Sequence, residues 1–227
     1  VSGLNWDFQR VVVSPGLPPA HPLMVAVLDQ AGQHGTSVDS ELDLFADALS
    51  DLARDRGYQP QVVGITGTNG KTSVTQWLAQ TLSKRAAVIG TLGIGFVDQL
   101  HEVGYTTPDA PRLQTGLFQL KQQGADYVAL EVSSHALDQG RVNGIHFDSA
   151  IFTNLSQDHL DYHGTMAAYG ASKAKLFKEF NTKNIVINIE DSFGRSLFMD
   201  LVEQIGKTIW LYPRGLLKAT LFHPWSL

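Results

Sequence analysis

The ten residues GITGTNGKTS, residues 64–73, decide how this 227-residue chain is expected to fold. An apolar run at 62–65 leads into them and a helical pattern at 72–83 follows, so they join a predicted buried strand to a predicted helix. Glycines in such a turn let backbone N–H groups point at phosphate oxygens, and the helix N-terminus adds positive potential. The stretch therefore predicts a phosphate-binding loop.

The residues of this loop have distinct expected roles. Lys71 would reach the β- and γ-phosphates of ATP, and the Thr72 hydroxyl would bind Mg²⁺. The strict spacing G-x-x-x-x-G-K-[ST] is not met, because its first glycine falls on Ile65 and Gly64 lies one residue early. A tight turn with an exposed lysine is the alternative interpretation. The expected ATP-binding residues of the loop are Gly67, Thr68, Asn69, Gly70, Lys71, Thr72 and Ser73.

The chain beyond this loop alternates between strand and helix patterns. Apolar runs predict buried strands at 62–65, 86–89, 127–132, 150–152 and 185–189. Helical spacing predicts helices at 72–83, 111–123, 166–180 and 192–204. This alternation implies an α/β fold with a mostly parallel sheet flanked by helices. Ligands of such sheets bind at the carboxyl ends of the strands, which the polar motifs follow here.

Three parts are expected along the chain. Residues 1–60 predict an incomplete α/β N-terminal segment with a strand at 11–13, a helix beginning near 23–28 and a helix at 40–54. Residues 61–212 form the expected ATP-binding domain, and residues 213–227 form an atypical tail. Charge supports a boundary near residue 60, because the first 60 residues hold three basic and eight acidic side chains and the remainder holds fourteen of each.

Composition excludes several classes of protein. The net charge of −5 provides no global basic field for nucleic acid. No apolar run approaches the roughly 20 residues that span a bilayer, so no membrane partner is expected. The absence of cysteine removes disulfides and thiolate metal sites and fits the cytoplasm. We expect a cytoplasmic monomer.

Further motifs follow the predicted strands. They are Tyr105–Pro108, Glu131–His135, Phe152–Gly164 and Tyr169–Phe177. Together with residues 66–73 they resemble the Mur ligases and their folylpolyglutamate synthetase relatives, which form an amide through ATP-driven acyl phosphate chemistry. From about Lys71 to Tyr212 the resemblance is to the Mur ligases of peptidoglycan precursor synthesis that add the third amino acid. It implies UDP-MurNAc-L-Ala-D-Glu and meso-diaminopimelate or L-lysine as substrates, with ATP and Mg²⁺.

The resemblance extends to the metal and catalytic residues. Glu131 is a Mg²⁺ candidate on its own chemistry, because carboxylate oxygens at a strand end suit a hard cation. The resemblance implies that His159 helps to hold a second Mg²⁺ and that Lys173 is carbamylated by CO₂, giving an anion that supports the metal. With Lys71 these two residues form the expected catalytic set. A structural histidine and a solvated lysine are the alternatives. Lys175 lies two residues from Lys173, and the spacing from Tyr169 favours Lys173.

The remaining expected contacts also come from the resemblance. It implies that Asn154 contacts the nucleotide and that the UDP-muramoyl peptide lies against Thr106, Thr107, Ser133, Gln139 and Arg141. A guanidinium group is chemically suited to an anionic substrate.

Both ends of the chain depart from this pattern. Residues 1–60 resemble the D-glutamate-adding ligase instead, which predicts a hybrid chain. The amino-acid-binding C-terminal domain of the family is not recognised in residues 213–227, so the chain alone is expected to be inactive in ligation, which needs both substrates in a closed site. The alternatives are a folylpolyglutamate synthetase-like ligase, a non-catalytic nucleotide-binding fragment and a plain P-loop NTPase. The motifs at 131–135 and 154–163 argue against the first.

Overall fold

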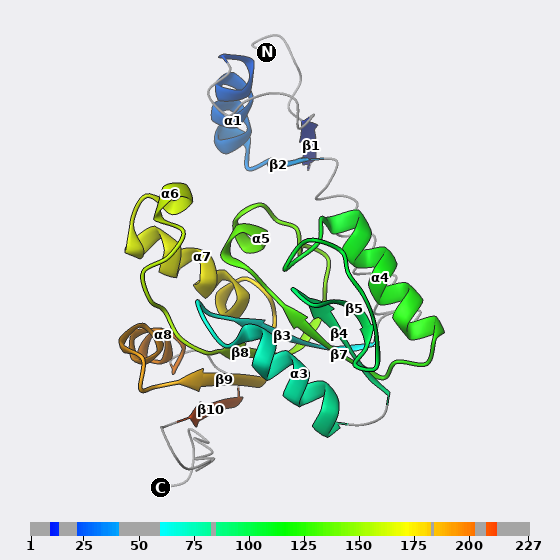
Figure 1. Cartoon of the computed structure of the whole chain (residues 1–227). Helices are drawn as coiled ribbons and strands as arrows, with labels where there is room; N and C mark the ends of the chain where they lie inside the picture. The colour runs from blue at the N-terminus through cyan, green and yellow to red at the C-terminus, as the bar shows by residue number, and fades with distance from the viewer. Residues whose placement is uncertain are drawn as a thin grey trace, which may run out of the picture.

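The computed structural model describes residues 10–13, 22–40, 60–82, 85–182, 184–202 and 208–212. Within these ranges, strands alternate with helices over most of the chain (Figure 1). The main body holds an eight-stranded sheet in the order β10-β9-β8-β3-β7-β4-β5-β6. Of the helix expected over residues 40–54, Ser40 is instead the last residue of strand β2 (Ser37–Ser40). The rest of that helix and the tail over residues 213–227 lie outside the described residues.

Six parallel strands make up most of this sheet and confirm the expected α/β fold. They are β3 (Gln61–Thr66), β4 (Ala86–Gly90), β7 (Tyr127–Glu131), β8 (Phe147–Phe152), β9 (Asn184–Asn188) and β10 (Thr208–Tyr212). β3 lies between β7 and β8 and is parallel to both. The carboxyl ends of these three strands therefore meet at one edge, where the loops at 67–70, 132–133 and 153–159 emerge.

Helices cover the two faces of the sheet, which carry separate apolar cores. On β7, Val128 and Leu130 belong to the core beneath α4 (Ala110–Gln122) and α7 (Met166–Lys178). Ala129 belongs instead to the core beneath α3 (Lys71–Leu82). Successive strand residues point to opposite faces, so a strand buried on both sides is apolar at consecutive positions. This burial explains the continuous apolar runs in the sequence.

The predicted helices α3, α4, α7 and α8 (Ser192–Val202) are confirmed to within a few residues at each end. Asp109 caps the N-terminus of α4, and its carboxylate accepts a hydrogen bond from the backbone N–H of Arg112. Thr165 caps the N-terminus of α7, and its hydroxyl accepts a hydrogen bond from the N–H of Ala168. This cap fixes the start of α7, and with it the rotation of the helix that carries Lys173.

Several short elements were not predicted. An antiparallel extension of the sheet is formed by β5 (Gly93–Phe96) and β6 (Gln99–His101). Two short helices, α5 (Ser134–Asp138) and α6 (Leu160–His163), follow the carboxyl ends of β7 and β8. β5 contains two glycines with positive φ, at Gly93 and Gly95, which weaken the strand pattern in the sequence.

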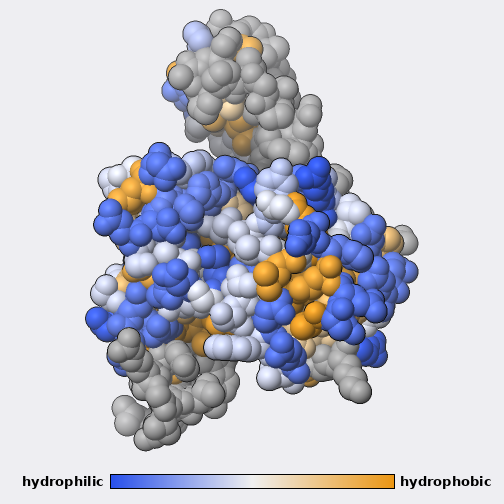
Figure 2. Space-filling model, viewed as in Figure 1, coloured by the Kyte–Doolittle hydropathy of each residue, from blue (hydrophilic) through white to orange (hydrophobic). Residues whose placement is uncertain are grey.

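The described part of the N-terminal segment has a sheet of its own. β1 (Arg10–Val13) pairs in parallel with β2 (Ser37–Ser40), and α1 (Pro22–His34) connects them (Figure 1). The strand and the first helix expected in this segment are confirmed. Figure 2 shows a mostly hydrophilic face, with apolar side chains gathered where Figure 1 labels β4 and β5. None of the helices in the described ranges is long and apolar enough to cross a bilayer.

Candidate nucleotide-binding and catalytic site

The phosphate loop runs from the end of β3 to the first turn of α3, as predicted. Gly67 and Gly70 adopt φ angles of 152° and 82°, which side chains with a Cβ rarely tolerate. A Cβ at Gly67 would also lie 1.9 Å from the Thr153 hydroxyl oxygen. At Gly70 a Cβ would meet no atom within 4 Å. The first glycine is therefore required by close packing, and the second by the turn into the helix.

The loop is fastened to the segment after β8. The Thr68 N–H donates to the Asn154 carbonyl oxygen at 2.8 Å, and the Asn69 N–H donates to Asn154 Oδ1 at 3.0 Å. In return, Asn154 Nδ2 donates to the Asn69 carbonyl oxygen at 3.0 Å. Asn154 was expected to contact the nucleotide. In the structure its side chain and backbone hold the loop in shape, and the nucleotide contact stays a prediction.

Two lysines meet at the carbonyl oxygen of Gly67. Lys71 Nζ donates to it at 3.0 Å and also to the Thr68 carbonyl oxygen at 3.0 Å. Lys173 Nζ donates to the same Gly67 oxygen at 2.9 Å. Sequence positions 71 and 173 are thus brought together, although they lie on different helices.

The surroundings lower the pKa of both amines. Burial lowers the pKa of Lys71, against the opposing attraction of Glu131 and Asp158. Burial, assisted by the positive charge of Lys71, lowers the pKa of Lys173 to about 7. The Lys173 side chain is only 1% exposed. Near neutral pH a large fraction of Lys173 is therefore the uncharged amine, the form that reacts with CO₂.

Glu131 forms a second polar centre beside the loop. Its carboxylate is 1% exposed and accepts hydrogen bonds from the Thr72 hydroxyl at 3.0 Å and the Thr91 N–H at 3.0 Å. The Thr91 hydroxyl approaches the same carboxylate at 3.2 Å. A Cβ at Gly90 would lie 2.2 Å from Glu131 Oε1, so the glycine leaves room for the carboxylate. The predicted metal ligands Thr72 and Glu131 are in direct contact.

His159 and Lys173 both lie around the ring of Tyr169. The His159 ring centroid is 5.9 Å from that of Tyr169, and Lys173 Nζ is 4.5 Å from it. His159 has a φ of 51°, the only positive value of a non-glycine residue within the described ranges, and such strain is typical of functional sites. Across the same ranges, no three histidine or carboxylate side chains converge on one point. The Asp158 carboxylate lies 3.6 Å from His159 Nε2, and a carbamate on Lys173 would add further oxygen atoms.

The expected substrate-binding residues form one connected group. The buried Thr107 hydroxyl donates to the Glu131 carbonyl oxygen at 2.7 Å and accepts from the Ser133 N–H at 3.0 Å. Arg141 donates to the Thr107 carbonyl oxygen at 3.0 Å and to Gln139 Oε1. The Thr91 hydroxyl lies 3.1 Å from the hydroxyl of Thr106. The structure therefore brings all five together, next to Glu131.

Asp138, which the sequence did not single out, joins this group to α6 and α7. Its carboxylate accepts from the Tyr162 hydroxyl at 2.9 Å and from Lys175 Nζ at 3.4 Å. The hydrogen bond from Tyr162 is the main cause that lowers the pKa of Asp138. The bond to Asp138 gives Lys175 a structural partner, which supports Lys173 over Lys175 as the reactive lysine.

Three other residues of the site were also missed. Thr91 contacts Glu131, Thr153 donates to the Asn69 carbonyl oxygen at 2.7 Å, and the Tyr169 hydroxyl lies 3.2 Å from Thr68 Oγ1. Thr153 lies in the motif Phe152–Gly164 and Tyr169 in the motif Tyr169–Phe177, and membership of these motifs was the only indication in the sequence that they belong to the site. Thr91 follows a buried strand, as a ligand-contacting residue of a parallel sheet often does.

Comparisons with known proteins agree on one family. A sequence model of the Mur ligase middle domain matches residues 65–215. The UDP-N-acetylmuramoyl-L-alanyl-D-glutamate–2,6-diaminopimelate ligase of Ralstonia nicotianae is 48% identical over 207 residues, covering 85% of this chain and 40% of that protein. The ligase of the same name from Neisseria meningitidis serogroup A is 57% identical over 137 residues, covering 59% of this chain and 28% of that protein.

Solved structures give the same result. A structure of a UDP-N-acetylmuramoyl-L-alanyl-D-glutamate–2,6-diaminopimelate ligase superposes with a TM-score of 0.66 at 30% identity, covering 93% of this chain and 47% of that one. A crystal structure of MurF from Acinetobacter baumannii, with a TM-score of 0.55 at 17% identity and covering 79% of this chain and 37% of that one, shares the fold.

The length of these matches bears on the N-terminal segment. The chain spans less than half the length of these relatives. The Ralstonia match covers more of the chain than residues 61–227 contain, so it includes part of the first 60 residues. The separate resemblance of that segment, and the hybrid chain it implies, stay predictions. Through its phosphate loop, its parallel sheet and the family match over residues 65–215, the chain belongs to the Mur ligase family by its middle domain.

Proposed function

We propose that this domain binds Mg²⁺·ATP at the phosphate loop and serves an amide ligase that adds the third amino acid to UDP-MurNAc-L-Ala-D-Glu. The observation that carries the proposal is the contact between the Thr72 hydroxyl and the buried Glu131 carboxylate, directly beside Lys71. A hydroxyl and a carboxylate oxygen are the hard ligands that Mg²⁺ prefers. The names of the diaminopimelate ligases at 48% and 57% identity support the choice of substrate.

The residues present fit the nucleotide. The positive φ at Gly70 and the open space around it leave room for phosphate oxygens at the N-terminus of α3. Lys71 donates to two backbone carbonyl oxygens, which a phosphate group can replace as partner. Bound Mg²⁺ would neutralise charge on the transferred phosphoryl group. Thr72 and Glu131 would hold that ion, and Lys71 would hold the phosphate oxygens.

The proposed reaction has two steps. A terminal carboxylate oxygen of the dipeptide attacks the γ-phosphorus of ATP, so that ADP leaves and an acyl phosphate forms. The neutral amine of diaminopimelate or lysine then attacks the acyl carbon, inorganic phosphate leaves, and the nitrogen releases one proton to solvent. Arg141, next to Thr107, offers a guanidinium group to the anionic substrate, and the threonines at 106 and 107 offer hydroxyl groups.

Carbamylation of Lys173 is part of the same proposal. The neutral amine nitrogen forms a bond to the carbon of CO₂ and releases one proton to solvent, which leaves a carbamate anion. The lowered pKa of Lys173 supports this step, because it provides the neutral amine near pH 7. The anion would relieve the repulsion between Lys71 and Lys173, which share the Gly67 oxygen. It would also add oxygen ligands beside the Tyr169 ring, near which both Lys173 and His159 lie.

Isothermal titration calorimetry with Mg²⁺·ATP tests the nucleotide site in the 227-residue chain. Ligation itself is tested in a protein of the relatives' full length, by release of phosphate that depends on both the UDP-linked dipeptide and diaminopimelate or lysine. The choice between these amino acids, the cytoplasmic location and the monomeric state belong to the proposal.

A further inference from the structure

We propose that Tyr169 is a positioning residue whose hydroxyl fixes the phosphate loop and whose ring fixes the Lys173 amine, so that the two keep one separation. This inference rests on the proposed function, because it assigns a role within the same site. Tyr169 is 1% exposed and lies in the first turns of α7, four residues before Lys173. Residues at this spacing lie on the same helix face, here the face toward the loop.

The hydroxyl group of Tyr169 completes the hydrogen bonding of Thr68. Thr68 Oγ1 lies 3.2 Å from the Ser156 carbonyl oxygen, which can only accept, and it accepts from the Ser156 N–H at 2.9 Å. The single hydroxyl hydrogen of Thr68 is thus assigned to Ser156. The Tyr169 hydroxyl, at 3.2 Å, is then the donor to Thr68. The side chain of Thr68 is therefore held from two directions, by Ser156 in the segment after β8 and by Tyr169 on α7.

The ring of Tyr169 provides the second surface that holds the Lys173 amine. Lys173 Nζ lies 4.5 Å from the ring centroid, within the range in which an aromatic face attracts an ammonium group or an N–H. On its other side the amine donates to the Gly67 carbonyl oxygen at 2.9 Å. The amine is therefore held between the ring and the loop backbone.

These contacts form a closed circuit. It runs from the Gly67 oxygen to the Lys173 amine, to the Tyr169 ring, through the Tyr169 hydroxyl to Thr68, and back along the chain to Gly67. Neither the loop nor the amine can move without disturbing the other. The two halves of one side chain thus have separable effects, the hydroxyl on nucleotide binding and the ring on the lysine.

The hydroxyl is tested by calorimetry with Mg²⁺·ATP on the 227-residue chain and its Tyr169→Phe variant. Loss of one hydrogen bond to the loop is expected to weaken binding about two- to ten-fold. The matched control is Tyr127→Phe, at the opposite end of β7 from the loop, which is expected to bind like the parent chain. Equal affinity of Tyr169→Phe and the parent chain would overturn the role of the hydroxyl.

The ring is tested in the ligand-free chain by NMR of ¹³C-labelled lysine, with Lys173→Arg to assign the signal. The ε-methylene protons of Lys173 are expected to be shifted upfield by the ring, to keep that shift in Tyr169→Phe and to lose it in Tyr169→Leu. Tyr169→Met, with a flexible side chain, replaces the leucine variant if that variant fails to fold. An upfield shift that persists without the ring, or that is missing in the parent chain, would overturn the proposal.

The consequence for Lys173 is read from the same samples in ¹³C-bicarbonate. The carbamate resonance is expected to be retained in Tyr169→Phe and weakened in the variant without a ring; equal intensity in both would count against positioning by the ring. Absence of Mg²⁺·ATP binding in the parent chain would contradict the proposed function. The ring-shift measurement needs no nucleotide and would still decide the inference.

Discussion

Replacing Glu131 by Gln separates the role of this carboxylate in folding from its proposed role in binding Mg²⁺. The amide has the same shape, so Oε1 can still accept from the Thr91 N–H, and the hydroxyls of Thr72 and Thr91 can rotate to accept from the new NH₂ group. Hydrogen bonds to a charged acceptor contribute about 1 kcal/mol more than those to a neutral one. Relief of the buried charge offsets part of this difference.

We therefore expect the substitution to lower the free energy of unfolding by about 1 kcal/mol. This loss lowers Tm by about 2–4 °C for a domain of this size. The effect on Mg²⁺·ATP is expected to be larger. Ligand at a hundred times its Kd stabilises a protein by about 2.7 kcal/mol. If the loss of a ligating carboxylate weakens binding about ten- to a hundred-fold, as seen for partners of metal ligands, only about 0.4–1.4 kcal/mol of this stabilisation remains.

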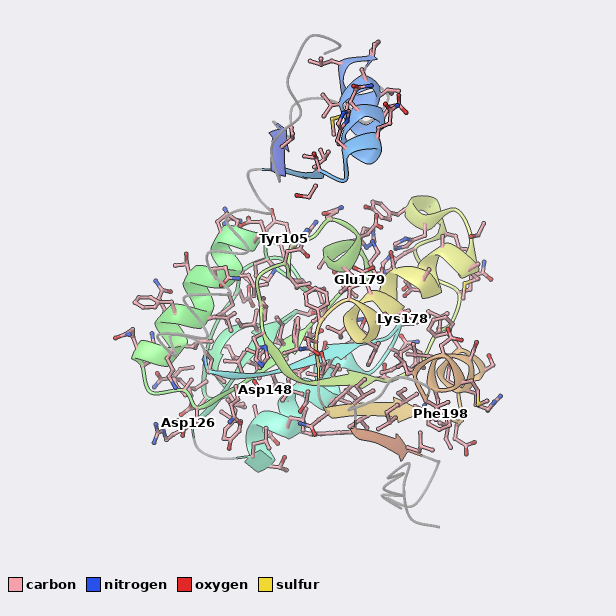
Figure 3. All side chains as sticks on the ribbon, turned by 180° about the vertical axis from the view of Figure 1, so that it is seen from behind. Tyr105, Asp126, Asp148, Lys178, Glu179 and Phe198 are labelled. Atoms are coloured by element: carbon pink, nitrogen blue, oxygen red, sulfur yellow. The ribbon has the colours of Figure 1, made fainter. Side chains whose placement is uncertain are left out.

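The assay is thermal unfolding with and without Mg²⁺·ATP at one fixed concentration. Glu179→Gln is the matched control, because Glu179 is exposed at the far end of α7 (Figure 3). The control is expected to show the full increase in Tm on addition of Mg²⁺·ATP, and Glu131→Gln about half of it or less. An undiminished increase in Glu131→Gln would refute the assignment of Glu131 as a metal ligand.

Three further predictions follow from other contacts of the site. In CO₂-free buffer, urea unfolding is expected to show that the parent chain gains stability relative to Lys173→Met from about pH 7 towards pH 10, by up to about 1.4 kcal/mol per pH unit. In this range the unfolded chain binds a proton at Lys173 that the folded chain lacks. Parallel plots of stability against pH for the two proteins would disprove the lowered pKa. Asp138→Asn is expected to reduce the loss of stability below about pH 4. The hydrogen bond from Tyr162 lowers the pKa of Asp138, so the parent chain loses the stabilisation by this carboxylate as pH falls through the lowered pKa, and the variant has no such stabilisation to lose. Gly67→Ala is expected to abolish Mg²⁺·ATP binding in calorimetry, since its Cβ would overlap the Thr153 hydroxyl; normal affinity would show that the loop tolerates a shift.

The long strands and helices were predictable because each has enough residues to show a clear apolar pattern in the sequence. The apolar run at 127–132 and the helical spacing at 166–180 gave β7 and α7 with small errors at the ends. The short elements were not predictable in this way. β6 has three residues, of which two are polar, and its pairing with β5 is what makes it a strand. α5 has five residues, too few for a helical pattern to emerge.

The residues of the candidate site also differ in how far the sequence predicts them. The loop at 67–73 has a local signature, so its residues were found from the chain itself. Lys173 and His159 came from the resemblance, because nothing in their immediate neighbours marks them. The contacts of Tyr169 with Thr68 and of Thr91 with Glu131 join residues 101 and 40 positions apart. Only the packing of α7 and β4 against the loop edge creates such contacts.

The most direct test of the account is the affinity of the chain for Mg²⁺·ATP before and after Lys71→Ala. Lys71 donates two hydrogen bonds to loop carbonyl oxygens and is placed to exchange them for phosphate oxygens. Lys121→Ala, in the last turn of α4, provides the matched control. The account predicts that calorimetry detects binding in the parent chain and the control and at least about ten-fold weaker binding in Lys71→Ala, for the loss of charged hydrogen bonds. Equal affinity in all three proteins would contradict the phosphate-loop assignment.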